Sequence, residues 1–320
     1  MNALANGQLR TRPVISVVIP VRNEGARLPA AISSIVAGRS SHFPLEIILV
    51  DDASSDGCCD GLPATWTSLQ QLVRLEVVRL PRWSGIPYAR NAGAAAAHAP
   101  ILFITDANVL FPNNWDVPIR WRIAPDRVLC AGIADMDSPF CGYGCRLLFP
   151  SMGVEWIRDP GLYSGYVPIS PCSGTAITAD LFRRVGGYDT AMPIYGAAEP
   201  EFSVRLWLYG AQIVSMPDLI LRHKFRPPSE RQRFLDAIGK ISLRNYLRFG
   251  MLYLDRQRID QMLHYYSGHS SSNVAEALQS LSSGEVWQRR RLLEERLPHR
   301  FSSFVDLFGV RDAFGHLAHD

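Results

Sequence analysis

The chain has 320 residues, of which 47% are hydrophobic, so it can form one large or two modest globular domains with an ample core. A net charge of +3 is too small to require nucleic acid as a partner, and no apolar segment approaches the ~20 residues of a membrane span. The six cysteines form no disulfide-like framework and no secretory signal is visible, so we expect free thiols and a cytoplasmic protein.

The first hundred residues alternate between apolar, strand-sized runs and helical patterns. This alternation is typical of a mostly parallel sheet with helices on both faces, so we expect an α/β fold. Continuous apolar runs of this length also indicate strands that are buried on both faces. The expected strands cover residues 14–20, 45–50, 75–79 and 101–105, and the expected helices cover residues 28–36 and, in an alanine-rich stretch, 94–97.

Polar residues follow these strands, at the place where ligands bind in open α/β sheets. Asp51 and Asp52 follow the second strand and can accept hydrogen bonds from a nucleoside base or ribose, although a turn rich in Asp and Ser explains the stretch equally well. Asp106 and Asn108 follow the fourth strand and offer two oxygen ligands with one residue between them. Mg²⁺ and Mn²⁺ prefer such ligands and often bridge to a diphosphate. Taken alone, an Asp-x-Asn pattern is more often a turn or a helix cap.

Four short motifs occur in the order seen in glycosyltransferase family 2. They read Ile-Pro-x-Arg-Asn-Glu from Ile19, Val-Asp-Asp-Ala-Ser-x-Asp from Val50, Ala-Arg-Asn-x-Gly from Ala89, and Asp-x-Asn from Asp106. The chain resembles this family, whose enzymes have the GT-A fold and use nucleotide-diphosphate sugars. The resemblance implies a GT-A fold, a nucleotide-diphosphate sugar donor, with a UDP-sugar as first choice, and a divalent cofactor, Mn²⁺ or Mg²⁺.

The second half of the chain adds to this resemblance. Residues 173–189 resemble the acceptor side of these enzymes, and residues 199–207 resemble their acidic motif at a helix start. Residues 222–226 read Arg-His-Lys-Phe-Arg and resemble the His-x-Phe-Arg segment of the polypeptide N-acetylgalactosaminyltransferases, a related GT-A family. The resemblance therefore covers about residues 14 to 226 and implies little about the remainder.

Carried over residue by residue, the resemblance implies three groups of site residues. Arg90 and Arg226 are the candidates to contact the diphosphate, because a guanidinium matches paired oxygens. Arg90 could equally tie loops to Asp51 or Asp52. The implied metal ligands are Asp106, Asn108 and His223; the implied donor site is Pro20, Arg22, Glu24, Asp51, Asp52, Arg90, Asp106 and Arg226; and the implied acceptor side is Gly174, Tyr195 and Glu201.

Glu199 is the candidate base that deprotonates the acceptor. Pro200 suits the first helical position, so we expect Glu199 to cap the helix. We also expect Arg205 to pair with Glu201, which leaves Glu199 free. In the N-acetylgalactosaminyltransferases, which retain configuration, the acid lies at the place of Ala198, so this chain favours inversion. Retention, and a Glu199 that merely caps the helix, stay open as alternatives.

The chain departs from family 2 in its metal motif, because Asn108 stands where the family has an aspartate. One negative charge is lost, so we expect weaker metal affinity. A non-catalytic GT-A-like module that binds a sugar or nucleotide is the alternative function. Sugar-phosphate nucleotidyltransferases and dinucleotide-dependent oxidoreductases need glycine-rich loops, whereas residues 20–25 contain one glycine. The sugar, the oligomeric state and the acceptor (peptide or protein, lipid-linked saccharide, small molecule) stay open.

Helical patterns replace the sheet pattern after residue 227. In the helix expected over residues 233–254, Lys240, Arg244 and Arg248 form a basic stripe. We favour a solvated face of a packed helix over peripheral contact with an anionic membrane, the other explanation of such a stripe. A polar linker is expected over residues 267–272, and a surface helix with internal ion pairs over residues 286–297. The expected organisation is a flexible N-terminus (1–13), a GT-A domain (14–228) and a C-terminal helical region (229–320).

Overall fold

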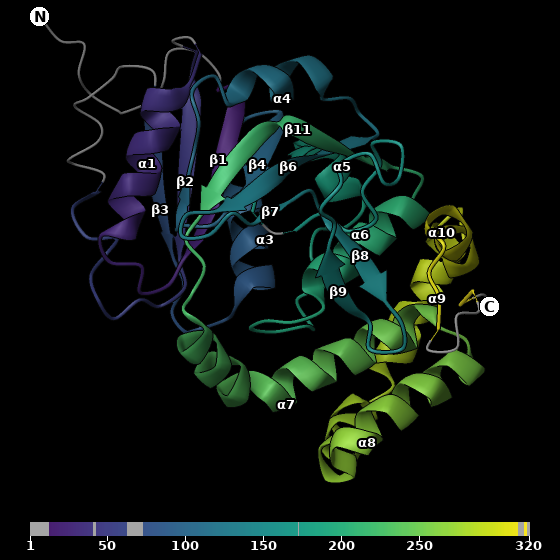
Figure 1. The fold of residues 1–320 in the computed structure, drawn as a ribbon. Coiled ribbons are helices and arrows are strands. Elements are labelled where there is room, and N and C mark those ends of the chain that lie inside the picture. The colour runs from purple at the N-terminus through teal and green to yellow at the C-terminus, as the bar shows by residue number, and fades with distance from the viewer. Residues whose placement is uncertain (1–12, 41–42, 63–72, 172, 313–316, 319–320) are drawn as a thin grey trace, which may run out of the picture.

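A sheet of nine strands forms the centre of the molecule (Figure 1). The computed structural model describes residues 13–40, 43–62, 73–171, 173–312 and 317–318. The strand order along the sheet is β3-β2-β1-β4-β10-β6-β11-β5, and β7 pairs with β6. The strands of this sheet are β1 (Ile15–Val21), β2 (Leu45–Asp51), β3 (Val73–Arg79), β4 (Ile101–Ile104), β5 (Val109–Leu110), β6 (Arg127–Asp135), β7 (Cys141–Gly142), β10 (Thr175–Thr178) and β11 (Gln212–His223), and a separate two-stranded sheet contains β8 (Cys145–Leu148) and β9 (Gly153–Trp156).

The first half of the sheet is parallel, as the sequence predicts. The strands β1 to β4 are all present, and every residue of β1, β2 and β4 is buried. Val21 pairs with Asp51, and Val18 pairs with Ile104. Because these strands run in the same direction, the loops that follow them open at one edge of the sheet. We call this edge the carboxyl edge.

The second half of the sheet is mixed. β10 runs antiparallel between β4 and β6, with Thr175 opposite Ile104, so the residues before β10 lie beside the end of β4. β11 is parallel to β6, and its last residues pair with the short β5, where His223 lies opposite Val109. These antiparallel pairings bring the start of β10 and the end of β11 to the carboxyl edge.

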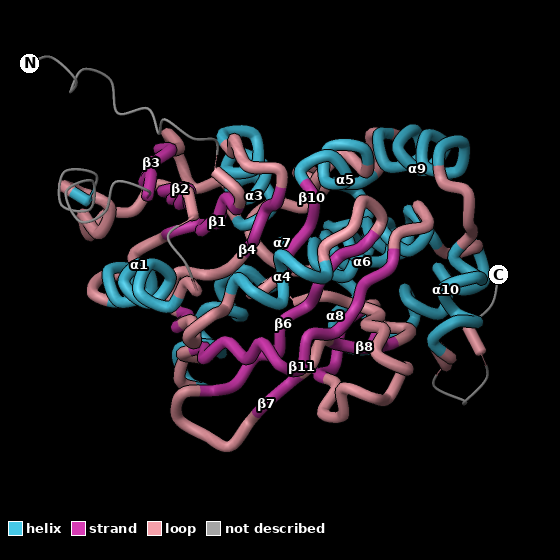
Figure 2. The backbone as a smooth tube through the Cα atoms, turned by 90° about the horizontal axis from the view of Figure 1, so that it is seen from above, coloured by secondary structure: helices cyan, strands magenta, loops and turns pink. Residues whose placement is uncertain are grey.

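Helices cover both faces of the sheet, and Figure 2 shows α1 and α3 on opposite sides of β1 and β4. Successive side chains of a strand point to opposite faces. Ile15, Val17 and Ile19 of β1 therefore enter the core under α1, and Val18 enters the core under α5 and α6. The predicted α/β architecture is confirmed. The helices of this part are α1 (Arg27–Gly38), α3 (Ile86–Ala96), α4 (Asp116–Arg122), α5 (Ala179–Arg184) and α6 (Ala198–Leu208).

In the described part of the chain, four helices follow β11 and share a second apolar core with α6. Within α8, Ser270 has non-helical backbone angles (φ −165°, ψ 99°), so two helical segments meet inside the predicted polar linker, residues 267–272, most of which are exposed. The helix predicted after it is confirmed, with an Arg290–Glu294 ion pair of 2.8 Å. No helix among the described residues is long and apolar enough to cross a membrane. The four helices are α7 (Pro228–Tyr253), α8 (Arg256–Leu281), α9 (Glu285–Arg296) and α10 (Phe301–Phe308).

The three cations in the basic stripe of α7 have different surroundings. Lys240 pairs with Glu276 of α8 at 2.6 Å. Arg244 donates a hydrogen bond to the carbonyl oxygen of Ala191, and Arg248 is fully buried. Arg244 and Arg248 therefore bind other parts of the protein, and the predicted solvated face holds for Lys240 but not for these two residues.

The cysteines of the described residues, Cys58, Cys59, Cys130, Cys141 and Cys145, are free thiols, as predicted. Burial raises the pKa of the Cys130 thiol to about 12, so this side chain stays protonated and unreactive at neutral pH.

Candidate active site

Asp106 is the centre of a cluster of polar side chains at the carboxyl edge. Ser173 donates a hydrogen bond to its Oδ2, Arg90 Nη2 lies 3.4 Å from its Oδ1, and His223 Nε2 lies 3.8 Å from its Oδ2. Burial raises the pKa of the Asp106 carboxyl, but the hydrogen bonds and charges of these neighbours outweigh burial and hold the pKa below its ordinary value. Asp106 is therefore ionised at neutral pH and able to bind a cation.

The pairing of β5 with β11 brings the other predicted metal ligands to the same place. Asn108 Nδ2 donates to the carbonyl oxygen of Lys224 at 2.9 Å, and the Lys224 N–H donates to the carbonyl oxygen of Asn108 at 3.0 Å. His223 directly precedes Lys224. This pairing therefore brings His223 to the same edge as Asp106 and Asn108, although more than a hundred residues separate them in the chain.

The donor atoms of this cluster fit a divalent cation. Ligands of one Mg²⁺ or Mn²⁺, with bonds of about 2.0–2.2 Å, lie ~3–4 Å apart, and the 3.8 Å between Asp106 Oδ2 and His223 Nε2 is in that range. Asn108 is held through Nδ2, so its amide oxygen is the atom that it can offer. His223 Nδ1 is buried without a hydrogen-bond partner among the described residues, and the ring packs against Phe225 with centroids 4.2 Å apart.

A second group of possible metal ligands, Glu46, Glu76 and His98, lies near the opposite ends of the parallel strands. Arg74 occupies this group: its Nη1 lies 3.3 Å from Glu46 Oε1, and its Nη2 lies 2.6 Å from Glu76 Oε2. A guanidinium already supplies the positive charge there, so we assign no metal to this group.

Arg90 links Asp106 to the candidate base. Its guanidinium is fully buried, donates to Glu199 Oε1 at 2.8 Å, and lies over the ring of Tyr188 at 5.2 Å. The sequence suggested either a diphosphate contact or a tie to the Asp51–Asp52 loop. In the structure, Arg90 forms ion pairs with Asp106 and Glu199 and so joins the two halves of the site, and its contact with a diphosphate stays a prediction.

The Asp51–Asp52 pair at the end of β2 is buried and holds neighbouring loops. Asp52 accepts hydrogen bonds of 2.7 Å from the N–H groups of Ser84 and Gly85, one on each carboxylate oxygen. Asp51 accepts from Ser54 N–H and pairs with Arg79 at 2.7 Å. These contacts fix the walls of the predicted nucleoside site.

The loop after β1 lies against the same walls. Arg22 donates to the carbonyl oxygens of Asp52 and Ala53 at 2.6 and 2.8 Å, and its guanidinium lies over the ring of Trp83 at 4.6 Å. Glu24 pairs with Arg27 at 3.0 Å. Pro20 is a buried residue of β1. Trp83 is 40% exposed, which makes it a candidate platform for a planar base that the sequence motifs did not indicate.

Helix α6 begins at Ala198, so the predicted capping role of Glu199 is wrong. The residue before the helix is Ala197, and Pro200 is the third helical residue. Proline fits there because the first four N–H groups of a helix have no partner within the helix. Glu199 lies in the first turn with its side chain 14% exposed, and its carboxylate faces Arg90.

Glu201 belongs to the interior rather than to an open acceptor surface. Its carboxylate is fully buried, and Arg205 binds it with two hydrogen bonds of 2.8 and 2.7 Å, which confirms the predicted ion pair. Tyr253 of α7 donates a third hydrogen bond at 2.6 Å. Glu201 therefore ties α6 to α7, and it can touch an acceptor only by leaving this network.

Of the other two residues of the predicted acceptor side, Tyr195 lies at the surface beside α7, whereas Gly174 is buried in the sheet. Tyr195 is 39% exposed and packs edge-on against Phe234, and Arg226 lies over the same Phe234 ring at 4.7 Å. Gly174 has a φ of 89°, and a Cβ at this position would lie 2.8 Å from the Cβ of Ala131. Glycine at 174 thus lets β10 start beside Asp106. Phe234 was not indicated by the sequence motifs.

Comparisons with known proteins agree with this geometry. Residues 16–125 match the sequence model of the family described as Glycosyl transferase family 2. Polypeptide N-acetylgalactosaminyltransferase 8 of Drosophila melanogaster is 29% identical over 264 residues, which are 77% of this chain and 44% of that protein. Polypeptide N-acetylgalactosaminyltransferase 6 of Bos taurus is 28% identical over 316 residues, which are 92% of this chain and 49% of that protein. The chain spans about half the length of these relatives.

Solved structures share the fold. The crystal structure of GalNAc-T7 with UDP, GalNAc and Mn²⁺ matches with a TM-score of 0.72 at 22% identity, over 93% of this chain and 56% of that chain. The mannosyltransferase PcManGT from Pyrobaculum calidifontis, in complex with GDP-Man and Mn²⁺, matches with a TM-score of 0.53 at 17% identity, over 97% of this chain and 89% of that chain. The chain therefore has the GT-A fold, and its residues 16–125 match glycosyl transferase family 2. In particular, it is similar to the polypeptide N-acetylgalactosaminyltransferases over most of its length.

Proposed function

We propose that this protein transfers a sugar from a UDP-sugar to a hydroxyl group of an acceptor, with the help of a divalent metal ion. One observation carries the proposal: at the carboxyl edge of the sheet, Arg90 forms ion pairs with two carboxylates, Asp106 and Glu199. The Asp106 carboxylate also lies 3.8 Å from Nε2 of His223. Cation ligands and a candidate base therefore lie on opposite sides of one guanidinium.

Asp106, Asn108 and His223 are the residues that would hold the metal. When bound, a divalent cation supplies positive charge that stabilises the departing diphosphate. Ser173 and Arg90 fix the Asp106 carboxylate through its two oxygens and so orient the ligand. The buried acids Asp51 and Asp52 shape the nucleoside site on the neighbouring strand.

Glu199 is the proposed base. Arg90 binds its Oε1, so the carboxylate is held in place and Oε2 is the atom that takes the proton of the acceptor hydroxyl. As that proton moves, the hydroxyl oxygen bonds to the anomeric carbon and the bond from carbon to the diphosphate breaks, which inverts the carbon. The similarity to enzymes that retain configuration makes retention the competing outcome. NMR of the transferred sugar distinguishes the two, because retention would reject Glu199 as a base in a single displacement.

The relatives also suggest which substrates to test first. They are named polypeptide N-acetylgalactosaminyltransferases, so UDP-N-acetylgalactosamine is the first donor and a polypeptide the first acceptor. Because the chain spans about half of those proteins, neither substrate follows from the similarity alone.

A panel of nucleotide sugars, with and without Mn²⁺, tests the proposal. A bound donor stabilises the folded protein by about 2.7 kcal/mol at a hundredfold excess over its dissociation constant. We expect a rise in melting temperature with UDP-sugars plus Mn²⁺, and slow release of UDP in the absence of an acceptor. No stabilisation by any nucleotide sugar, together with no UDP release, would reject the function and favour a binding module of another kind.

A further inference from the structure

Helix α7 holds the turn that leads into α6. Asn245 is fully buried, and its Nδ2 donates to the carbonyl oxygens of Pro193 at 2.8 Å and Tyr195 at 3.0 Å. Arg244, one residue earlier, donates to the carbonyl oxygen of Ala191 at 2.7 Å. Each of these bonds joins a side chain of α7 to the backbone of the turn, so α7 determines the path of the turn.

This turn has a backbone conformation that needs support. Ile194, Gly196 and Ala197 have φ angles of 64°, 96° and 65°, and only glycine adopts such angles without a steric cost. Other residues keep this conformation where the surrounding structure over-determines it. Ala197 directly precedes α6, so the turn sets where α6 begins and therefore where Glu199 lies.

The donor side of the site holds the same turn from the other direction. The Ile86 N–H donates to the carbonyl oxygen of Ile194 at 3.0 Å, and a Cβ added to Gly85 would lie 2.1 Å from the Cα of Ile194. Gly85 N–H in turn donates to Asp52. The turn is thus fixed between the loop that follows β3 and helix α7.

We propose that Asn245 is a positioning residue of the active site, which holds Tyr195 and Glu199 in the places where an acceptor is bound and deprotonated. This inference rests on the proposed function. The carbonyl side of the amide, Oδ1, meets no hydrogen-bond donor among the described residues, so the two N–H bonds to the turn are the contribution of this side chain. Helix α7, which the sequence assigns to a separate C-terminal region, is then part of the catalytic unit.

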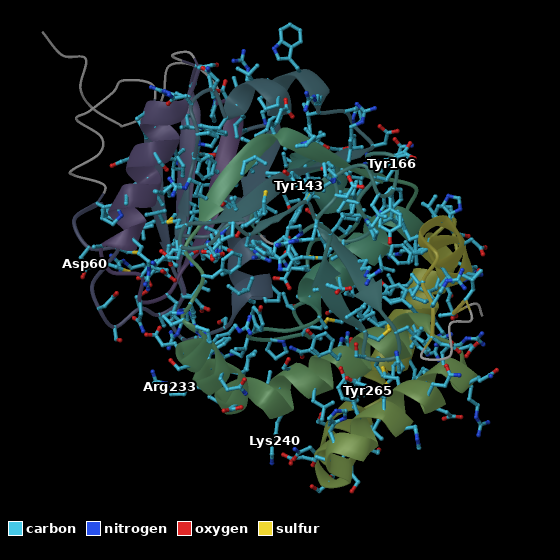
Figure 3. The ribbon with its side chains drawn as sticks, in the orientation of Figure 1. Asp60, Tyr143, Tyr166, Arg233, Lys240 and Tyr265 are labelled. Carbon is cyan, nitrogen blue, oxygen red and sulfur yellow. The ribbon has the colours of Figure 1, made fainter. Side chains whose placement is uncertain are left out.

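Asn245→Asp tests the proposal, because aspartate has the same shape but directs an oxygen, instead of N–H donors, at two carbonyl oxygens. Asn245→Ala removes the donors without this repulsion and serves as the milder variant. We expect kcat to fall on the order of ten- to a hundredfold, with the affinity for UDP and Mn²⁺, measured by calorimetry, unchanged. Lys240→Ala is the matched control: Lys240 lies on the same helix, pairs with Glu276 on the surface, and points away from the sheet in Figure 3. Its kcat should equal that of the wild type.

Hydrogen exchange provides a readout that does not depend on activity. In Asn245→Ala we expect faster exchange in peptides that cover residues 189–201 and unchanged exchange in β1 and β4. Unchanged exchange in residues 189–201, an unchanged kcat in both variants, or a loss of UDP affinity in step with kcat would each overturn the inference. A wild-type protein that uses no nucleotide sugar would instead overturn the proposed function, and the exchange result would still decide whether Asn245 holds the turn.

Discussion

The candidate site has two parts that are built in different ways. We call the proposed donor-binding part, which contains Asp51, Asp52 and Asp106, the donor edge, and the proposed acceptor-binding part, which contains Tyr195 and Glu199, the acceptor edge. At the donor edge, Asp51, Asp52 and Asp106 lie at or just after the carboxyl ends of parallel strands, and the backbone register of the sheet places them. At the acceptor edge, Tyr195 and Glu199 belong to a turn and a helix start that hydrogen bonds from α7 hold in place. The first edge depends on local chain direction, whereas the second depends on contacts across about fifty residues of sequence.

This difference indicates which substitutions should affect one edge without affecting the other. A change at the donor edge should alter the binding of metal and nucleotide while the turn stays intact. A change at the acceptor edge should alter turnover while nucleotide binding stays intact. Arg90 is the exception, because its guanidinium pairs with a carboxylate from each edge.

Asp106→Ala should have the largest effect. It removes the carboxylate that faces His223 and Arg90, so we expect activity to fall on the order of a thousandfold and Mn²⁺ binding in the presence of UDP to be lost. Calorimetry measures the binding. Asp137→Ala is the control, because this acid is exposed and pairs with Lys224 outside the cluster. Mn²⁺ affinity that is equal in Asp106→Ala and wild type would refute the metal site.

Glu199→Gln should separate turnover from donor binding. Glutamine keeps an oxygen for the hydrogen bond from Arg90 but cannot take a proton, so we expect kcat to fall by ~10²-fold or more. The affinity for UDP should stay unchanged. Steady-state kinetics and calorimetry on the same preparation measure both quantities. Normal turnover would show that Glu199 has a structural role only.

Substitutions of two proposed metal ligands, His223 at the end of β11 and Asn108 after β4, should change Mn²⁺ affinity in opposite directions. His223→Ala removes a ligand and should weaken Mn²⁺ binding by about tenfold or more, whereas Asn108→Asp adds a negative charge and should strengthen it. Titration of Mn²⁺ in the presence of UDP measures both. A Mn²⁺ affinity equal to that of the wild type in both variants would mean that neither residue contacts the ion.

Asp189→Asn should have the smallest effect, which is confined to stability. Burial raises the pKa of the Asp189 carboxyl, but the Arg248 charge and hydrogen bond, 2.9 Å away, outweigh burial and lower that pKa. Since the pKa is lowered by folding, the carboxylate stabilises the protein above its ordinary pKa of about 4, and this contribution is lost as the pH falls. We expect Asp189→Asn to cost about 1–3 kcal/mol at pH 7 in urea unfolding, and less as the pH falls below about 4. A cost that stays constant with pH would exclude the ion pair as its source.

Much of the donor edge could be predicted from the sequence, because it depends on short-range patterns. Apolar runs of strand length, each followed by polar residues, predict parallel strands whose ends share an edge, and β1 to β4 confirm this arrangement. The pair of Arg205 with Glu201 was also predicted, since residues four apart on a helix are neighbours.

Only the tertiary structure decided the acceptor edge and the roles of the buried cations. Residue spacing does not reveal that Arg90 joins Asp106 to Glu199 or that Arg248 pairs with Asp189. The start of α6 also differed from prediction: Ala197, the residue before the helix, has a left-handed backbone, and Asn245 bonds to the carbonyl oxygens of Pro193 and Tyr195 in the turn before it. Such contacts depend on which helices and strands pack against each other. The sequence pattern predicts neighbouring residues only where the direction of the strands is enough to determine them, as it is for β1 to β4.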